Sequence, residues 1–364
     1  MKNIINQQFY RSTKTYTMNV LDTMINATQT LQKGEYIMNN TVFFCNGQKK
    51  SSYEVLPDFQ EIEHWIKETK EKLPLKLTCF AMYEKDVLET DNFSDTRISK
   101  LINLSTFKNE KYITSKEFSL NNYKSAILTF VNQIYEIYKD YKFEYDHTEK
   151  KMIDIVEFSP IATGYFFHEI LGHSFEIDHL SRNKRITQLE IPKWLCFHDL
   201  ADRNDLIGVG NFDDCGKKLK NRIIIQNGEI SKKIMKNYGI LRSQNFGKRP
   251  IPRMRTTRVF TNRQFRKSIP KVVVEKINGG YINPDTLEIM INGDGFYYSD
   301  KKYLAKKITI NTNLNSILQQ ASYLGENIEF SSGFCIKKNQ TIRVGMEAPT
   351  SQFKNLEVEF EIYR

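Results

Sequence analysis

The feature that most constrains this sequence is an apolar stretch, residues 158–180, that ends in a cluster of histidines and carboxylates. Ser159 and Pro160 are typical of a helix start, because a hydroxyl caps free N–H groups and proline fits the first helical position. An aromatic run follows, and three of the six histidines of the chain then fall within twelve residues. Buried imidazoles and carboxylates are costly unless they are hydrogen-bonded, paired or bound to a metal. The stretch therefore predicts a buried helix with a strongly polar end.

The spacing of the first two histidines departs from the usual zinc-peptidase helix. That helix carries histidines at i and i+4, which lie on one face. Here His168 and His173 are five residues apart, with Glu169 between them, and a regular helix would turn them about 140° apart. One wide π-helical turn absorbs an extra residue, and Gly172 makes such a distortion easier. We therefore predict a distorted helix that presents both imidazoles together.

Two interpretations of this cluster remain at this point. A lone buried histidine is usually a hydrogen-bonded core residue. Two histidines that bracket Glu169, with Glu176 and Asp178 shortly after them, favour a metal site instead, because imidazoles and carboxylates are common metal ligands.

Three segments together resemble a known family. From His168 to Asp178 the sequence reads His-Glu-Ile-Leu-Gly-His-Ser-Phe-Glu-Ile-Asp, and it resembles the TldD/PmbA metallopeptidase signature His-Glu-x-x-Gly-His-x-x-Glu-x-Asp. Residues 250–257, Pro-Ile-Pro-Arg-Met-Arg-Thr-Thr, are similar to the family's Pro-x-Pro-Arg-Met-x-x-Thr. Residues 333–350 resemble its C-terminal Gly-x-Cys-Gly-Lys-x-Gly-Gln segment. The resemblance covers residues 150–364, and the part before it is shorter than is usual in the family.

The resemblance implies a catalytic zinc site with one Zn²⁺ per chain. Cys335 stands at the position of the family's third zinc ligand, beside His168 and His173, although the glycine after that cysteine is Ile336 here. Two imidazoles and a thiolate leave a fourth position open, as catalytic zinc requires. Glu169 is then placed to act as general base and to protonate the leaving amine.

Four further polar residues have less specific roles. Glu176 and Asp178 are candidates for hydrogen-bonding the ligand imidazoles, which would fix the tautomers of those imidazoles. His179 and His198 are weaker candidates for metal ligands.

The resemblance also implies a substrate and a partner. Family members cleave unfolded peptides and trim leader peptides, which they hold as an extended strand along a sheet edge. Arg253 and Arg255 are candidates for binding this peptide, because guanidinium groups suit carboxylates. The expected function is zinc-dependent peptide hydrolysis in peptide maturation or degradation, in a homodimer or a heterodimer with a family homologue. The alternative is a non-catalytic, peptide-binding partner subunit of an active homologue.

One basic segment stands out in a chain of net charge +10. From Lys248 to Lys271 there are nine positive charges and no acid. Such a stripe binds nucleic acid in some proteins, but it equally suits an acidic peptide or a charged β surface. The chain lacks a recognisable nucleic-acid module, so we do not expect nucleic acid as a partner.

The length of 364 residues allows two domains. We predict an α+β fold, with an N-terminal α+β domain at residues 1–150. Residues 151–364 should contain the metal-binding helix and a mostly antiparallel β catalytic domain. Helical periodicity marks two main N-terminal helices, Phe59–Leu73 and Asn121–Tyr141. A shorter helix is expected at Asn313–Leu324.

Strand and turn signals complete the predicted fold. In the N-terminal part, short strands are expected at residues 36–38, 41–45 and 75–82, with a turn at Asn46-Gly47 and strand and loop over 83–118. A buried strand at residues 152–157 should lead into the metal-binding helix. Farther on, Asn227-Gly228, Asn278–Gly280 and Asn292-Gly293 lie between β-rich runs and predict hairpin turns.

The sequence composition indicates the cellular compartment in which the chain is expected. No apolar run of 18 residues occurs, so we expect no membrane-spanning helix, and the N-terminus lacks the features of a signal peptide. Five scattered cysteines without a paired motif suit a reducing compartment. The expected location is the cytoplasm.

Overall fold

The structure is a computed structural model, in which the chain forms two compact units. The described residues are 3–18, 23–31, 34–38, 41–45, 64–65, 75–90, 94–108, 111–119, 123–139, 141, 143–201, 211–234, 240–242 and 249–364. The first unit is Met1–Asp140 with Ser243–Arg249, and the second is Tyr141–Arg242 with Pro250–Arg364. The boundary predicted between residues 150 and 151 falls inside strand β8 (Tyr145–Phe158).

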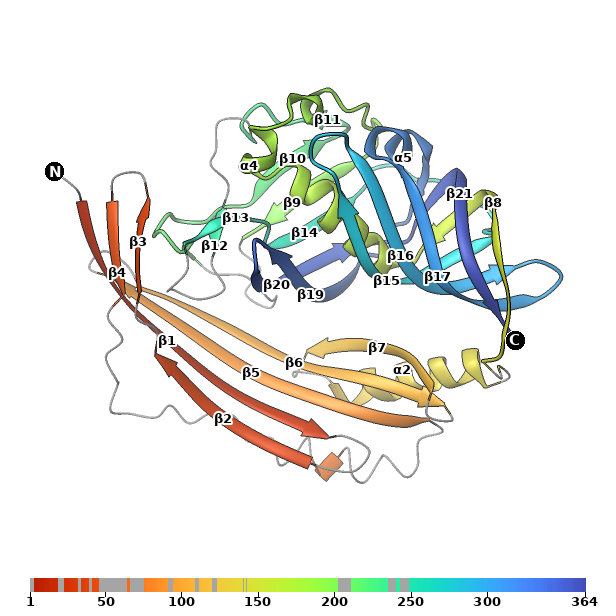
Figure 1. The fold of residues 1–364 in the computed structure, drawn as a ribbon, viewed down its shortest axis with the longest axis horizontal. Coiled ribbons are helices and arrows are strands. Elements are labelled where there is room, and N and C mark those ends of the chain that lie inside the picture. Colours follow the sequence, from red (N-terminus) through yellow and green to blue (C-terminus); the bar gives the residue numbers. More distant parts are fainter. Residues whose placement is uncertain are drawn as a thin grey trace. The chain divides into compact units, whose positions relative to one another are not determined.

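The described part of the first unit contains a sheet of long strands and the helix α2 (Figure 1). The sheet has the order β3-β4-β1-β5-β6-β7, and β2 pairs with β1. Its strands are β1 (Asn3–Met18), β2 (Thr23–Leu31), β3 (Gly34–Met38), β4 (Thr41–Cys45), β5 (Lys76–Thr90), β6 (Ser94–Lys108) and β7 (Lys111–Ser119). Strands β3, β4 and β5 confirm the predicted strands, and β5 to β7 fill the stretch predicted as strand and loop.

Helix α2 (Tyr123–Tyr138) confirms the helix predicted at Asn121–Tyr141. Ile127 and Val131, four residues apart on its apolar stripe, are both 0% exposed. Of the helix predicted at Phe59–Leu73, only His64 and Trp65 are described, and both are helical. The turn predicted at Asn46-Gly47 lies outside the described residues.

The second unit contains a sheet that closes on itself through an additional strand pair (Figure 1). Its order is β17-β16-β15-β8-β21-β18, and β17 also pairs with β21. The strands after β8 are β15 (Val272–Ile282), β16 (Glu288–Tyr298), β17 (Lys302–Asn313), β18 (Ala321–Leu324) and β21 (Ser351–Tyr363). Only the β8–β15 pair of this sheet is parallel, over residues 272–274. Strand β8 confirms the predicted strand at residues 152–157.

A second sheet of this unit has the order β11-β10-β9-β14-β20-β19. Its strands are β9 (Cys196–Leu200), β10 (Arg222–Gln226), β11 (Glu229–Ile230), β14 (Thr256–Phe260), β19 (Glu329–Lys337) and β20 (Gln340–Ala348). Its pairs are antiparallel apart from β14–β20. Two short strands, β12 (Ile240–Arg242) and β13 (Ile251–Arg253), pair separately. The described unit is therefore mostly antiparallel β, as predicted.

One of the three predicted hairpin turns is confirmed and two are wrong. Asn227 and Gly228 join β10 to β11 with φ of 51° and 79°, as a tight turn requires. Asn278–Gly280 and Asn292-Gly293 instead lie within β15 and β16, where Ile277 pairs with Gly293 across an irregular register. A Cβ on Gly293 would lie 2.5 Å from the Lys276 carbonyl oxygen. Glycine there permits a close approach of two strands, not a turn.

The helix predicted at Asn313–Leu324 is shorter than expected. Helix α5 spans Leu314–Gln320, and the Asn313 side chain caps it by accepting from the Asn315 N–H. Residues 321–324 form β18, which pairs with β21. No helix in the described part of the chain is long and apolar enough to cross a membrane.

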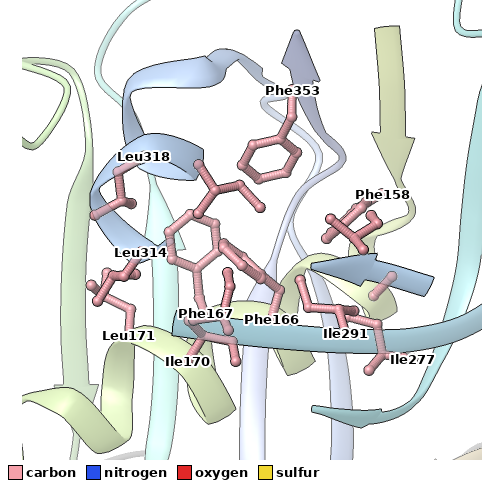
Figure 2. Packing of buried hydrophobic residues seen from close by; sticks show 14 of the residues in the cluster. Phe158, Phe166, Phe167, Ile170, Leu171, Ile277, Ile291, Leu314, Leu318 and Phe353 are labelled. Atoms are coloured by element: carbon pink, nitrogen blue, oxygen red, sulfur yellow. The ribbon is translucent and has the colours of Figure 1, made fainter. Parts of the chain in front are cut away.

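The core of the second unit surrounds the aromatic run that the sequence places before the histidines. Figure 2 shows Phe166 and Phe167 among Leu314, Leu318 and Phe353. The ring centroids of Phe166 and Phe353 lie 5.4 Å apart in an edge-to-face arrangement. Each buried phenylalanine side chain contributes roughly 1.5–3 kcal/mol. This packing fixes the helix whose end carries the candidate site.

Candidate metal centre

The helix that carries the two histidines changes from α to π geometry at the site. Helix α3 (Pro160–Phe166) begins at Ser159, whose hydroxyl accepts from the Ala162 N–H at 3.2 Å. It continues into the π-helix η1 (Phe167–Gly172), and the N–H of His173 bonds to the His168 carbonyl. That five-residue hydrogen bond confirms the wide turn predicted from the histidine spacing.

This geometry brings four predicted residues together. Ligand atoms of His168, Glu169, His173 and Cys335 all lie within 4.8 Å of one another. Cys335 Sγ is 2.9 Å from His173 Nε2, and Glu169 Oε2 is 3.6 Å from the same nitrogen. His168 and Cys335 are fully buried, whereas the Glu169 side chain is 22% exposed. The cluster is therefore closed on most sides and reaches solvent beside the glutamate.

The first imidazole has the environment of a metal ligand. His168 Nδ1 is 2.9 Å from Thr257 Oγ1 on β14. Its Nε2 is buried and has no hydrogen-bond partner among the described residues. A buried polar nitrogen without a partner costs about 1–3 kcal/mol, and a metal ion would remove that cost. Two imidazole nitrogens and a thiol also suit a transition metal of the zinc type. The residues present therefore fit a metal ion.

The second imidazole is held by a buried carboxylate. His173 Nδ1 is 2.8 Å from Glu176 Oε2, and the Met254 N–H donates to Glu176 Oε1 at 3.0 Å. Lys337 Nζ lies 2.5 Å from Glu176 Oε2. Burial would raise the pKa of Glu176, but His173 and Lys337 together hold it well below its usual range. A charged carboxylate at Nδ1 leaves the Nε2 atom of His173 directed at Cys335.

The electrostatics of the remaining groups differ from residue to residue. Burial lowers the pKa of His168, and neighbouring His173 lowers it further. Burial would also lower the pKa of His173, but Glu176 and Cys335 raise it well above its usual range. Metal binding at Nε2 would release that proton. Burial raises the pKa of Glu169, which brings this carboxylate closer to the neutral range that a general base needs.

The other predicted site residues lie outside this cluster. Asp178 Oδ1 pairs with Lys337 at 2.7 Å, so the structure places it one contact farther from the imidazoles than Glu176. His179 belongs to the short helix α4 (Ile177–Leu180). His198 lies on β9, where its Nε2 is 3.1 Å from Gln226 Oε1.

The structure does not support a peptide-binding role for the two predicted arginines. Arg253 is 1% exposed and Arg255 is 0% exposed. Arg253 donates to the carbonyls of Gln340, at 3.1 Å, and of Cys335. Arg255 donates to the Lys220 carbonyl at 3.2 Å. Both guanidinium groups face inward because buried backbone carbonyls need donors, so neither is placed to meet a peptide.

Sequence reasoning missed three contacts of the candidate ligands. Thr257 bonds to His168, Lys337 bonds to Glu176, and Arg253 bonds to the Cys335 carbonyl. The sequence could have pointed to these three residues, because they lie in the two segments downstream of the helix that resemble the family. These three side chains of the two segments contact the candidate ligands or the carboxylate that holds one of them.

Comparison with known proteins decides the family. Residues 151–359 match the family model described as the PmbA/TldA metallopeptidase C-terminal domain. The chain belongs to the TldD/PmbA family. All four residues of the candidate metal cluster fall inside the matched range.

Curated relatives of this TldD/PmbA family member carry metalloprotease names. A metalloprotease of Archaeoglobus fulgidus is 27% identical over 207 residues, which are 51% of this chain and 48% of that protein. A zinc metalloprotease TldD homolog of Saccharolobus solfataricus is 27% identical over 229 residues, 55% of this chain and 50% of that protein. The chain thus spans about half the length of the curated relatives that it matches.

Solved structures share the fold along nearly the whole chain. TldE from Thermococcus kodakarensis has a TM-score of 0.64 and 12% identity, covering 97% of this chain and 95% of that one. A putative modulator of a DNA gyrase from Thermotoga maritima has a TM-score of 0.59 with the same identity and coverage. At this level of identity the likeness shows the fold alone.

Proposed function

We propose that this family member is a zinc-dependent metallopeptidase that hydrolyses unfolded or leader peptides bound as extended strands, in peptide maturation or degradation. The observation that carries the proposal is the convergence of His168, His173 and Cys335, with Glu169 at the solvent-exposed side of the cluster. The metalloprotease names of the relatives support the same class of reaction.

In this proposal, His168, His173 and Cys335 hold a zinc ion. Thr257 and Glu176 bond to the Nδ1 atoms of the two histidines, which leaves both Nε2 atoms for the metal. The ion supplies Lewis acidity, which activates water and polarises the scissile carbonyl. Glu169 accepts the proton of the attacking water at a carboxylate oxygen and then donates it to the leaving amine. Its raised pKa suits both steps.

Strand β19 is the edge on which we place the peptide. It is the last strand of its sheet, and in the described structure it pairs only with β20. Cys335 on this strand is buried, whereas Phe334 and Ile336 on either side are 51% and 70% exposed. A peptide added to this edge would form backbone hydrogen bonds without regard to sequence. Its alternate side chains would meet the apolar face that Phe334 and Ile336 present.

Metal content and peptide cleavage, measured on the same purified variants, test this function. Wild type and Glu169→Gln should each bind zinc in a one-to-one ratio by mass spectrometry, because Glu169 is the base and not a ligand. His168→Ala and Cys335→Ala should lose zinc. Only the wild type should cleave an unfolded peptide.

Each other result has a definite meaning. A wild-type protein that stays free of zinc after zinc has been supplied would reject the proposal that the chain is a zinc-dependent enzyme. The alternative, a non-catalytic partner subunit, would then remain, and a co-purifying homologue would be sought. Cleavage of the peptide by the Glu169→Gln variant would show that Glu169 is not the general base. Full zinc occupancy in Cys335→Ala would assign the third ligand to another residue.

A further inference from the structure

Lys337 places a buried ammonium group directly behind the carboxylate that holds His173. Its Nζ lies 2.5 Å from Glu176 Oε2 and 2.7 Å from Asp178 Oδ1, and it donates to the Pro252 carbonyl at 3.2 Å. The Lys337 side chain is only 9% exposed. Because solvent screens a buried ion pair weakly, this cation compensates much of the cost of burying Glu176.

The place of Lys337 in the chain gives these contacts a second consequence. Lys337 ends strand β19, two residues after Cys335, and residues two apart on a strand point to the same face. The Cys335 thiol contacts His173 Nε2 at 2.9 Å, while the Lys337 ammonium bonds the carboxylate that contacts His173 Nδ1. One strand therefore acts on both nitrogens of the same imidazole, on one directly and on the other through Glu176.

We propose that Lys337 is a positioning residue of the metal centre, which through Glu176 orients the His173 imidazole toward the Cys335 thiol. The inference rests on the proposed function, in which His173 and Cys335 share one metal ion. Without the ammonium, the Glu176 carboxylate loses its 2.5 Å contact with a cation. The imidazole then loses its fixed orientation, and its Nε2 no longer meets the metal together with the thiol.

The next residue in the chain is a matched control. Lys338 Nζ contacts Asp178 Oδ2 at 3.2 Å, and its side chain is 54% exposed. Lys337 and Lys338 thus share a charge and the carboxylate partner Asp178, but of the two only Lys337 contacts Glu176. Comparison of the two separates an effect through Glu176 from a general loss of positive charge.

The test measures the zinc dissociation constant of the full chain by competition with a chromophoric chelator. Lys337→Met should raise this constant about 10–100-fold, the usual effect of removing a group behind a metal ligand. Lys338→Met should leave it within about twofold, as expected for an exposed pair. In a Glu176→Gln background, Lys337→Met should add little, because residues that act through one another are not additive.

Additive effects of Lys337→Met and Glu176→Gln would overturn the proposal, since a merely structural lysine would weaken binding independently of Glu176. Equal losses in the Lys337 and Lys338 variants would overturn it as well. If the wild type binds zinc and Lys337→Met binds it with the same affinity, the positioning role of Lys337 is rejected, whereas the proposed function is not. A wild type that binds no zinc rejects the proposed function itself. Circular dichroism checks folding, and Lys337→Gln replaces Lys337→Met in the cycle if that variant does not fold.

Discussion

At the scale of single residues, the candidate ligands are held in place by contacts from distant parts of the chain. Thr257 on β14 bonds to the imidazole of His168, and Arg253 on β13 donates to the backbone carbonyl of Cys335. A buried polar group that loses its hydrogen-bond partner costs about 1–3 kcal/mol. Loss of one partner should therefore affect stability as well as metal binding.

Arg253→Met should lower the free energy of unfolding by about 3 kcal/mol, because it removes the hydrogen bonds that the Arg253 guanidinium donates to the buried carbonyls of Cys335 and Gln340. Urea unfolding of purified protein measures this change. The control is Arg263→Met, at an exposed position of the same basic segment, where the expected change is within about 0.5 kcal/mol. An Arg253 variant of normal stability with a raised KM for peptide would restore the arginine as a substrate clamp.

The sequence predicted the reactive groups better than their supports. His168, Glu169 and His173 could be grouped because they lie on one turn of one helix, and Cys335 joined them through the family resemblance. Thr257, Lys337 and Arg253 bond to residues 89, 161 and 82 positions away in the chain, so their partners depend on how distant segments pack together. The arginines were assigned to a peptide because charge alone does not reveal burial.

At the scale of elements, the π-helix η1 shows how local spacing can specify a distortion. A histidine pair five residues apart is useful only if the helix widens, and the hydrogen bond from the His173 N–H to the His168 carbonyl shows that it does. The glycine-containing segments of β15 and β16 were wrongly predicted as turns. Gly293 serves a close strand approach, and sequence alone does not separate that use from a turn.

Gly172→Ala should weaken zinc binding about tenfold or more while changing unfolding stability by less than about 1 kcal/mol. Alanine favours a regular α-helix by about 1 kcal/mol over glycine, but its Cβ would lie 3.3 Å from the Phe167 carbonyl oxygen and 3.4 Å from Met254 Cγ. These contacts oppose the helical preference and strain the wide turn. Chelator competition and urea unfolding measure the two effects.

Gly279→Ala on β15 is the matched control for this substitution, because an added Cβ there meets no atom within 4 Å. Its zinc affinity should equal that of the wild type. A Gly172→Ala protein with wild-type affinity would show that the π-helical turn tolerates a side chain and that its geometry is set elsewhere.

At the scale of the whole molecule, the candidate site joins two sheets of one unit. The π-helix η1 follows β8 of the closed sheet, whereas Cys335 lies on β19 of the other sheet. Turn signals between β-rich runs predicted a mostly antiparallel β unit, but the pairing of β17 with β21 and the strand order within the two sheets could not be read from the sequence. Strand order depends on long-range packing that leaves no local pattern.

A metal ion shared by η1 and β19 should slow hydrogen exchange in both segments together. At zinc concentrations about 100 times the dissociation constant, binding stabilises the folded site by about 2.7 kcal/mol. Amides that exchange only when the site opens should then slow about 100-fold, while β5 and β6 of the first unit keep their rates. Exchange measured by mass spectrometry with and without zinc resolves these segments, and Cys335→Ala should abolish the difference. Slowing confined to η1 would mean that the histidines bind the ion without the cysteine, and the two sheets would then not be joined by metal.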